Sequence, residues 1–385
     1  MASSNPTTDL IDQLSQLSSR LFSGEDTGAR KEALQLSKKL TASLEQPEDV
    51  AVALAFSLWQ PIIPVTARIA VQLDLFKHIV NHGVPISSKE LASLSGGEEL
   101  LIIHEVGERL WQANPITEAM ATEGIAAGHR MLGEMVIGAA QKAPKYLKEA
   151  GYRCPTDPKD GLMQYAFQTK LTTFEFFSSM PEVLRDFNMF MGNTMGARSY
   201  WVDWFPVQER LLDGATADSV LLVDVGGGRG HDLLAFHEKY PGQGRLILQD
   251  LAPVTESIGY LDPAIERMSY DFFTEQPLKG ARAYFYHHIL HDWSDVKCME
   301  ILRQVKTAMR PGYSRLLLHE MIVPEQGAST FHAMLDMTMM AFNAGMERTE
   351  RQWRELLESA GFQVLKVWSP REEDADGIVE AMLKE

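Results

Sequence analysis

Apolar positions change their spacing along this chain of 385 residues. Between Asp9 and Leu44, leucines and isoleucines recur at helical intervals on both sides of a Gly-Glu-Asp-Thr-Gly break. This spacing predicts two amphipathic helices, whose apolar faces must pack against another part of the chain or a second subunit. From Ser219 onward, short continuous apolar runs alternate with amphipathic segments, which indicates an α/β protein with a parallel sheet.

The region between these two parts is predicted to be largely helical. Ala67 to Val80 has the pattern of one amphipathic helix, and Ser87-x-x-Glu90 is a capping box that opens a further helix, Lys89 to Leu94. Val106 to Trp111 is typical of a tight hairpin, so helix, helix and hairpin form a winged-helix pattern.

A long apolar helix is expected from Gly128 to about Ala143, before a loop marked by prolines. Phe174 to Met191 is rich in aromatic residues and methionine, and such segments fill cores or line adaptable apolar pockets. We expect this segment and Phe331 to Met346 to shape the pocket for a small substrate.

Seven strands are predicted in the last part of the chain. Their apolar runs are Ser219–Val225, Leu246–Gln249, a run ending at Asp271-Phe272-Phe273, Ala283–Leu290, Arg315–Val323, Phe362–Trp368 and Gly377–Leu383. Helices are expected between them at His231–Tyr240, at Ser294–Met309, and from Glu347-Arg348-Thr349 to Ala360-Gly361.

The first two predicted strands are joined by a glycine turn. Three glycines follow Val225, and Asp250 closes the second strand 26 positions after Asp224. Strand, glycine turn, helix, strand and acid form the arrangement that holds a nucleoside by its ribose. The dinucleotide-binding fingerprint requires a glycine at the position of His231, so binding of a dinucleotide is disfavoured. A turn that only connects strand and helix is the simpler alternative.

Asp-x-Gly-x-Gly-x-Gly, formed by Asp224, Gly226, Gly228 and Gly230, resembles the turn of class I S-adenosylmethionine-dependent methyltransferases. The resemblance implies a Rossmann-like sheet of seven strands with S-adenosylmethionine as cofactor. It implies that Asp224 meets the ammonium group, Asp250 the ribose, and Asp271 with Phe272 the adenine. The implied cofactor-binding residues are Asp224, Gly226, Gly228, Asp250, Leu251, Asp271, Phe272 and His287. A residue that only caps a turn is the alternative for Asp271.

His291-Asp292-Trp293 directly follows the fourth predicted strand. Ligands of open α/β sheets bind beyond the carboxyl ends of the strands, so His291 should face the same site as the glycine turn. This segment resembles the catalytic segment of plant and fungal O-methyltransferases, and Glu320 and Glu347 match the acidic positions that flank that histidine.

O-methylation needs such a base. A phenol has a pKa of about 10, so reaching the phenolate at neutral pH without a base costs on the order of 4 kcal/mol. A positioned base typically gains roughly 100- to 10,000-fold, and a nearby carboxylate fixes the imidazole tautomer and stabilises its cation. The candidate catalytic residues are His291, Asp292, Glu320, Glu347 and His129.

The inclusion of His129 reflects a second hypothesis. Some fungal pericyclases on this fold keep S-adenosylmethionine bound and use its sulfonium charge to steer dehydration and ring closure of 2-pyridone polyketides. The leading helices, the Gly-His-Arg-Met stretch and the loop at Gly151 resemble them, and His129 resembles the histidine that they use. His291 favours methyl transfer, because an arginine can replace it in the pericyclases. A non-catalytic cofactor-binding module is a third hypothesis.

A metal site is not expected, although His287, His288 and His291 lie close in sequence. His287 and His288 alternate faces on a strand, and no further ligand type clusters near them. A buried structural histidine is the alternative role for His287.

A formal net charge of −16 disfavours nucleic acid and anionic membranes as partners. Met1 to Asp9 is polar, no apolar run is long enough to span a membrane, and there are only two cysteines, so we expect a cytoplasmic protein.

We expect a helical and winged-helix-like dimerisation domain at 1–125, a helical linker and pocket segment at 126–215, and a cofactor-binding catalytic domain at 216–385. In plant-type O-methyltransferases the winged-helix module builds the dimer, which implies a homodimer. Glu98 to His104 is shorter than the helix that the family has before its hairpin.

Overall fold

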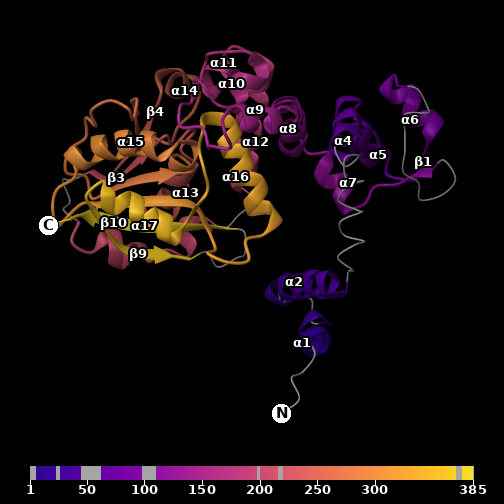
Figure 1. The fold of residues 1–385 in the computed structure, drawn as a ribbon, viewed down its shortest axis with the longest axis horizontal. Helices are drawn as coiled ribbons and strands as arrows, with labels where there is room; N and C mark the ends of the chain where they lie inside the picture. Colours follow the sequence, from indigo (N-terminus) through magenta and orange to yellow (C-terminus); the bar gives the residue numbers. More distant parts are fainter. Residues whose placement is uncertain are drawn as a thin grey trace. The chain divides into compact units, whose positions relative to one another are not determined.

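The computed structural model describes residues 6–22, 27–44, 62–97, 110–196, 200–215, 220–369 and 375–384. The chain divides into two compact units, Met1–Thr66 and Ala67–Glu385, which are described separately (Figure 1).

The first unit contains α1 (Pro6–Phe22) and α2 (Thr27–Leu44), the two helices predicted from the leucine spacing. They pack against each other in antiparallel fashion. Thr7 Oγ1, near the start of α1, donates to Ser43 Oγ, near the end of α2, at 3.3 Å, and Arg20 pairs with Glu32 at 3.0 Å. Leu17 and Leu36 are buried, whereas Ile11, Leu34 and Leu44 remain 49, 57 and 60% exposed. The helices therefore cover only part of their apolar surface.

The first half of the second unit is helical, as predicted. Its helices are α4 (Ile62–Gln72), α5 (Leu75–His82), α6 (Ser88–Ser95), α7 (Pro115–Met120), α8 (Glu123–Ala140), α9 (Ala143–Glu149), α10 (Leu162–Phe167), α11 (Thr173–Ser178) and α12 (Pro181–Gly196). The short turns η3 (Trp201–Asp203) and η4 (Gln208–Leu212) lead into the sheet.

Three boundaries differ from the sequence predictions. The single helix expected from Ala67 to Val80 is two helices, because Asp74 has a positive φ of 52° and interrupts the chain. The apolar helix α8 begins at Glu123, before Gly128. The proposed hairpin lies mostly outside the described residues, and its last part, β2 (Leu110–Trp111), pairs antiparallel with β1 (Ile86–Ser87). The capping box is present in part, since Ser87 Oγ accepts Glu90 N at 3.2 Å.

The rest of the unit is built on one sheet with the strand order β5-β4-β3-β6-β7-β10-β9. Its strands are β3 (Val220–Val225), β4 (Arg245–Asp250), β5 (Ile265–Ser269), β6 (Ala283–His287), β7 (Arg315–Val323), β9 (Phe362–Trp368) and β10 (Asp376–Leu383). The first five are parallel, and β10 runs antiparallel to both β7 and β9. An eighth strand, β8 (Arg348–Thr349), extends the pairing of β7.

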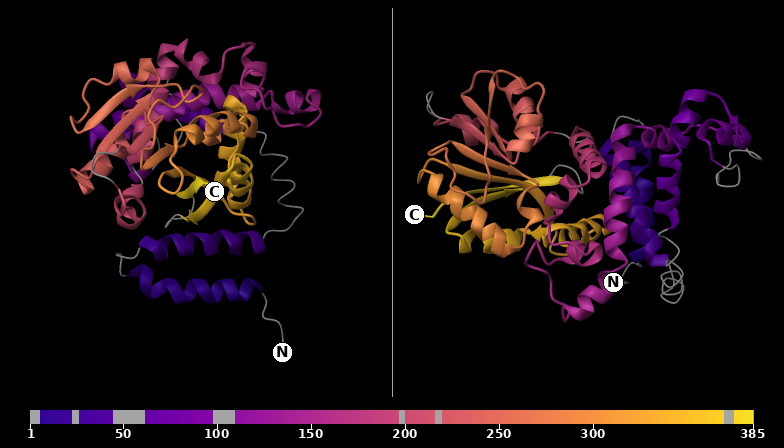
Figure 2. Two further views of the ribbon diagram at one scale, coloured as in Figure 1. Left: turned by 90° about the vertical axis from the view of Figure 1, so that its left-hand side faces the viewer. Right: turned by 90° about the horizontal axis from the view of Figure 1, so that it is seen from above.

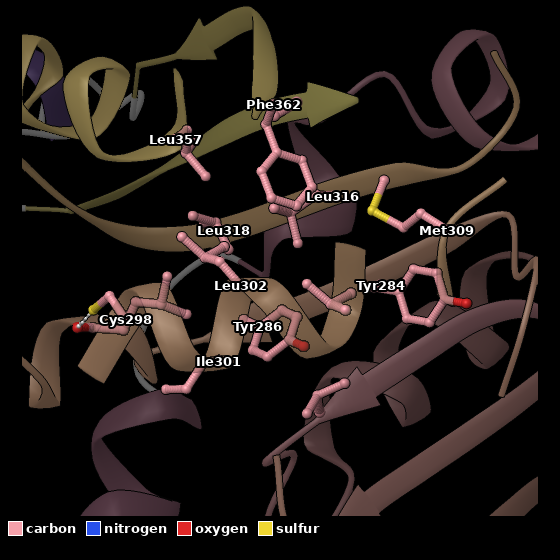
Figure 3. Packing of buried hydrophobic residues seen from close by; sticks show 14 of the residues in the cluster. Tyr284, Tyr286, Cys298, Ile301, Leu302, Met309, Leu316, Leu318, Leu357 and Phe362 are labelled. Carbon is pink, nitrogen blue, oxygen red and sulfur yellow. Dashed lines mark hydrogen bonds between the residues drawn. The ribbon is translucent and has the colours of Figure 1, made fainter. Parts of the chain in front are cut away.

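Helices cover both faces of this sheet (Figure 2). They are α13 (His231–Lys239), α14 (Ala252–Ser257), α15 (Asp295–Ala308), α16 (Thr330–Asn343) and α17 (Glu350–Ser359). Ile301 of α15 and Leu357 of α17 pack with Leu316 and Leu318 of β7 on one face (Figure 3). On the other face, Trp201 stacks on Phe236 of α13 and Phe285 of β6, with ring centroids 5.9 and 4.9 Å apart.

The predicted α/β sheet of seven strands is confirmed, and burial on both faces explains why its central strands β3, β4, β6 and β7 read as continuous apolar runs. The third strand ends at Ser269, so Asp271-Phe272-Phe273 lies in the following loop. None of the described helices combines the length and apolar character needed to cross a membrane.

Candidate active site

The chain turns sharply after β3, where Gly226 and Gly228 have positive φ angles of 75° and 58°. Gly226 N donates to Gln249 O of β4 at 2.7 Å. A Cβ on Gly226 would lie 2.5 Å from Ile289 Cδ1, whereas nothing lies within 4 Å of the Cβ position of Gly228. The turn therefore requires glycine at 226 and leaves open space beside 228.

Two carboxylates flank this turn. Asp224 is fully buried, and neither of its oxygens has a hydrogen-bond partner among the described residues. Burial, together with Asp232 and Asp250, raises the pKa of Asp224 well above its usual value. Asp250 accepts Gly228 N through Oδ2 at 2.9 Å and Leu251 N through Oδ1 at 2.7 Å.

These observations fit the expected cofactor. A buried carboxylate without partners is costly, and a cationic ammonium group is the ligand that offsets this cost best. The half-buried Asp250 sits at the end of β4, where an acid binds ribose hydroxyls, and the open space at Gly228 admits a ligand close to the backbone.

The other predicted cofactor residues lie along the same edge of the sheet. Phe272 Cε1 is 3.9 Å from the Cβ position of Gly226, so Phe272 reaches the turn. Leu251 directly follows Asp250 and is 49% exposed. Asp271 Oδ1 accepts Phe273 N at 2.9 Å, which is the turn-capping role named as its alternative.

His287 ends β6 with its Nδ1 2.7 Å from Asp232 Oδ2. The expectation that His287 and His288 point to opposite faces is wrong, because His288 has a φ of 53° and leaves the strand. Their rings are 4.6 Å apart, and the ring of His319 lies 3.9 Å from that of His287. Carboxylates also lie close to these histidines, Asp232 beside His287 and His319 and Asp376 beside His287 and His288, so the expectation that no further ligand type clusters near them is wrong as well.

His291 lies in η5 (Leu290–Asp292), just after β6, and is 6% exposed. Its Nδ1 is 2.8 Å from Glu347 Oε1 and 3.9 Å from Glu320 Oε2, and its Nε2 is 3.9 Å from Asp292 Oδ1. The structure thus brings together this base and the three acidic residues predicted around it. A proton on Nδ1 shared with Glu347 leaves Nε2 as the acceptor.

Glu320 fixes the backbone that carries His291. It is fully buried within β7, and its Oε1 accepts Ile289 N at 3.2 Å and Leu290 N at 2.8 Å. Ile289 also packs on Gly226, so the same segment links the base to the glycine turn.

The three carboxylates set the proton affinity of His291. Burial opposes the charged imidazolium, but Glu320, Glu347 and Asp292 outweigh burial and raise the pKa of His291 to about 10. Burial raises the pKa of Asp292 to about 6. Proton transfer to His291 from a phenol of pKa about 10 is then nearly balanced, whereas a histidine at its usual pKa of about 6.5 would make it cost about 5 kcal/mol.

Arg348 connects the segments of His291 and Glu347, although it belongs to none of the motifs that predict the site. Its guanidinium donates to Leu290 O at 3.2 Å and to Trp293 O at 2.9 Å, on either side of His291. It is 1% exposed and lies over the Trp353 ring at 5.0 Å. The one sequence signal was its place directly after Glu347.

His129 is not part of this group. It is half-buried in α8, burial lowers its pKa, and no hydrogen bond or ion pair joins it to His291 or Asp292 in the part of the chain that the structure describes. Its helix packs against α12 and α16, and α16 contacts η5. His129 therefore belongs to the helical layer beside the site.

The aromatic segment both fills the core and approaches the site. Phe177 is fully buried and meets Phe342 edge-on at 5.5 Å. Phe174 lies 6.5 Å from Trp293, the residue after Asp292. Phe174 is thus the member of this segment that reaches the catalytic loop.

Comparison of the sequence with known families gives one domain match. Residues 207–363 match the family described as O-methyltransferase domain. The chain is 52% identical to the O-methyltransferase penC of Penicillium thymicola, over 97% of this chain and 96% of that protein.

Two solved structures are similar over nearly the whole chain. The pericyclase LepI in complex with S-adenosylmethionine has a TM-score of 0.84 and 29% identity, covering 98% of this chain and 100% of that one. OxaC in complex with sinefungin and meleagrin has a TM-score of 0.84 and 26% identity, covering 100% of both chains.

Proposed function

Because this chain belongs to the O-methyltransferase family, we propose that it methylates a hydroxyl of a small polyketide or phenolic secondary metabolite. The enzyme is an S-adenosylmethionine-dependent O-methyltransferase. The observation that carries the proposed mechanism is the pair of His291 Nδ1 and Glu347 Oε1, 2.8 Å apart in a buried loop beside the glycine turn.

When bound, the cofactor supplies an electrophilic methyl group on a sulfonium and departs as S-adenosylhomocysteine. Asp224 would pair with its ammonium group and Asp250 with its ribose hydroxyls, while Gly226 and Gly228 would allow close approach of the backbone. Asp271, Phe272, Leu251 and His287 complete the proposed cofactor site.

His291 Nε2 accepts the substrate's hydroxyl proton while the oxygen is methylated. Glu347 holds Nδ1, which fixes the tautomer, and Glu320 and Asp292 stabilise the imidazolium that forms. Burial excludes water from the group, so these charges act more strongly than they would in solvent. His129 and Phe174 contribute to the walls of the substrate pocket in this proposal.

We expect one S-adenosylhomocysteine to form for each product molecule. Mass spectrometry of the cofactor pool during turnover, with phenolic acceptors and a 2-pyridone alcohol supplied separately, measures this ratio. Product formed from either compound while S-adenosylmethionine remains intact would contradict methyl transfer.

Activity should depend on pH through His291. Its pKa is raised to about 10, so the free enzyme holds the proton at neutral pH, and kcat/KM should rise with pH well above 6.5. Glu320→Gln removes a negative charge that stabilises the imidazolium but keeps an oxygen for Ile289 N and Leu290 N. The pKa of His291 then falls, and the rising limb should shift to lower pH by about one unit.

The exposed Glu355 provides the matched control for this experiment, because its side chain is 63% exposed and, among the described residues, its ion pair is with Arg351. Glu355→Gln should leave the pH profile unchanged. A profile that is identical in Glu320→Gln and the unaltered enzyme would rule out His291 as the titrating base. The acceptor's own ionisation is the same in all three proteins and cancels from the comparison.

Pericyclic ring closure remains the second candidate function, because LepI is similar along the whole chain. One local observation favours it: the pKa of Asp292 is raised to about 6 by burial, which suits an acid for a leaving hydroxyl. The cofactor's fixed charge would then only stabilise a polarised carbonyl and would not be consumed. His129→Ala should be strongly impaired only under this alternative.

We also propose a homodimer, built in part by α1 and α2. Ile11, Leu34 and Leu44 are about half exposed in the isolated chain, and apolar surface of this kind is typical of subunit interfaces. Light scattering should give twice the chain mass of 43.1 kDa for the full protein and about half of that value for a truncated chain starting at Val50. A full-length monomer at micromolar concentration would reject the dimer.

A cytoplasmic location is proposed from the free thiols of Cys154 and Cys298. Microscopy of a fluorescently tagged chain tests it, and a secreted or organellar signal would exclude it.

A further inference from the structure

Three polar side chains from different elements meet beside the catalytic loop. The proposed methyl transfer assigns no metal ion to them. His287 ends β6 and His319 lies opposite it in β7, while Asp232 is in the first turn of α13. The rings of His287 and His319 are 3.9 Å apart, and Asp232 Oδ2 lies 2.7 Å from His287 Nδ1.

Their ligand atoms are close enough to share one ion. One ligand atom from each of Asp232, His287 and His319 lies within 4.8 Å of the others. His319 is 5% and Asp232 8% exposed, so the cluster is largely shielded from solvent. Water competes little for such ligands, and three protein ligands from three rigid elements form a pre-arranged site.

Two nitrogens of this cluster lack partners. His287 Nε2 and His319 Nδ1 are buried without a hydrogen bond to any described residue. Asp232 lies on the Nδ1 side of His287, so an ion shared by the two residues would bind His287 through Nδ1. His319 Nδ1 is then the unpaired nitrogen that the ion can engage, and leaving such a buried atom unpaired is unfavourable. Imidazole nitrogen and carboxylate oxygen together are the ligands preferred by Zn²⁺ and by Co²⁺ in the same geometry.

We propose that Asp232, His287 and His319 bind one divalent transition-metal ion of the zinc and cobalt class. A second pair supports the site from outside: His288 Nε2 lies 2.9 Å from Asp376 Oδ1, and the His288 ring is 4.6 Å from that of His287. Groups in this position orient the ligands and add negative charge near the cation.

A metal ion bound at this site would inhibit methyl transfer. The proposed methyl transfer uses no metal, and His287 is also among the residues placed around the cofactor. An ion on His287 and the cofactor should therefore weaken each other's binding by the same factor. This coupling rests on the proposed function, whereas metal binding to the protein without cofactor does not.

The test uses full-length protein treated with a chelator and then titrated with Co²⁺ or Zn²⁺ in the absence of cofactor. Equilibrium dialysis with elemental analysis should give one ion per chain, and Co²⁺ should show the visible absorption of a tetrahedral site. His319→Asn and Asp232→Asn should each weaken binding at least about tenfold. His237→Asn is the matched control, because His237 lies on the same helix as Asp232 but faces Asp262 at 4.0 Å.

Either of two results would overturn the metal site: no saturable binding by the unaltered protein, or equal affinity in His319→Asn, Asp232→Asn and the control. If the variants do not fold, X-ray absorption of the unaltered protein loaded with Co²⁺ still decides the question. Imidazole scattering from two histidines is expected, and a shell of oxygen ligands alone would overturn the site. Cofactor consumption during turnover is measured separately, so failure here leaves the methyl-transfer assignment untouched.

Discussion

Replacing His291 by alanine should slow methyl transfer by about 100-fold or more, because the substrate hydroxyl then loses the proton acceptor proposed for it. The imidazole is 6% exposed and held by Glu347 at 2.8 Å, so a water molecule that enters the vacated space would not reproduce its basicity or orientation. Single-turnover formation of S-adenosylhomocysteine measures the chemical step without interference from product release. Calorimetry should show that S-adenosylmethionine still binds.

His237→Ala controls for the loss of a histidine elsewhere in the same domain, and its rate should match that of the unaltered enzyme. His129→Ala should have a modest effect, since His129 lies in α8 and has no hydrogen bond or ion pair with His291 among the described contacts. An unchanged rate in His291→Ala would remove this residue from the mechanism. If His291→Ala still formed product and His129→Ala lost most of its activity, ring closure would be favoured instead.

Asp250→Ala should weaken S-adenosylmethionine binding at least tenfold, as expected for the loss of charge-assisted hydrogen bonds to two ribose hydroxyls. The same carboxylate accepts Gly228 N and Leu251 N, so its removal also loosens the turn against which the cofactor lies. Calorimetry with S-adenosylmethionine and with S-adenosylhomocysteine measures both ligands, which share the ribose. The two affinities should fall by a similar factor.

Asp262 offers a matched comparison, because its Oδ1 also accepts a backbone amide, that of Ala264 at 2.8 Å. Asp262→Ala should bind both ligands as the unaltered enzyme does. Unchanged affinity in Asp250→Ala would take Asp250 out of the cofactor site, while a loss for S-adenosylmethionine alone would point to a role near the sulfonium.

The sheet could be predicted because burial on two faces leaves a direct trace in the sequence. The bounds of β7 and β9 agree with the predicted runs, since most of their residues are apolar and are bounded by turn residues. The break at Asp74 and the two-residue strand β8 leave no such trace, because neither changes the local alternation of apolar residues. The helix boundary at Glu123 was missed for the related reason that glycine and alanine there fit a helix as well as a loop.

The candidate site was predictable where a motif carries its chemistry in consecutive residues. His291, Glu320 and Glu347 were found in this way, and the structure brings them within 4 Å of the same imidazole nitrogen. Arg348 and His319 were missed because their roles depend on contacts made across the fold. Arg348 donates to Leu290, 58 positions earlier in the chain, and no local spacing encodes that contact.

Arg348 is the first residue of β8 and directly follows Glu347, which has a consequence for the energetics of catalysis. Glu347, just before the strand, holds the imidazole of His291, and Arg348, the first residue of the strand, holds carbonyl groups on both sides of that imidazole. Because Glu347 and Arg348 are consecutive, thermal displacement of β8 moves them together and changes little the distance between them. The dipoles around the reacting proton are set when the chain folds, so little reorganisation energy remains to be supplied when the charge on His291 changes.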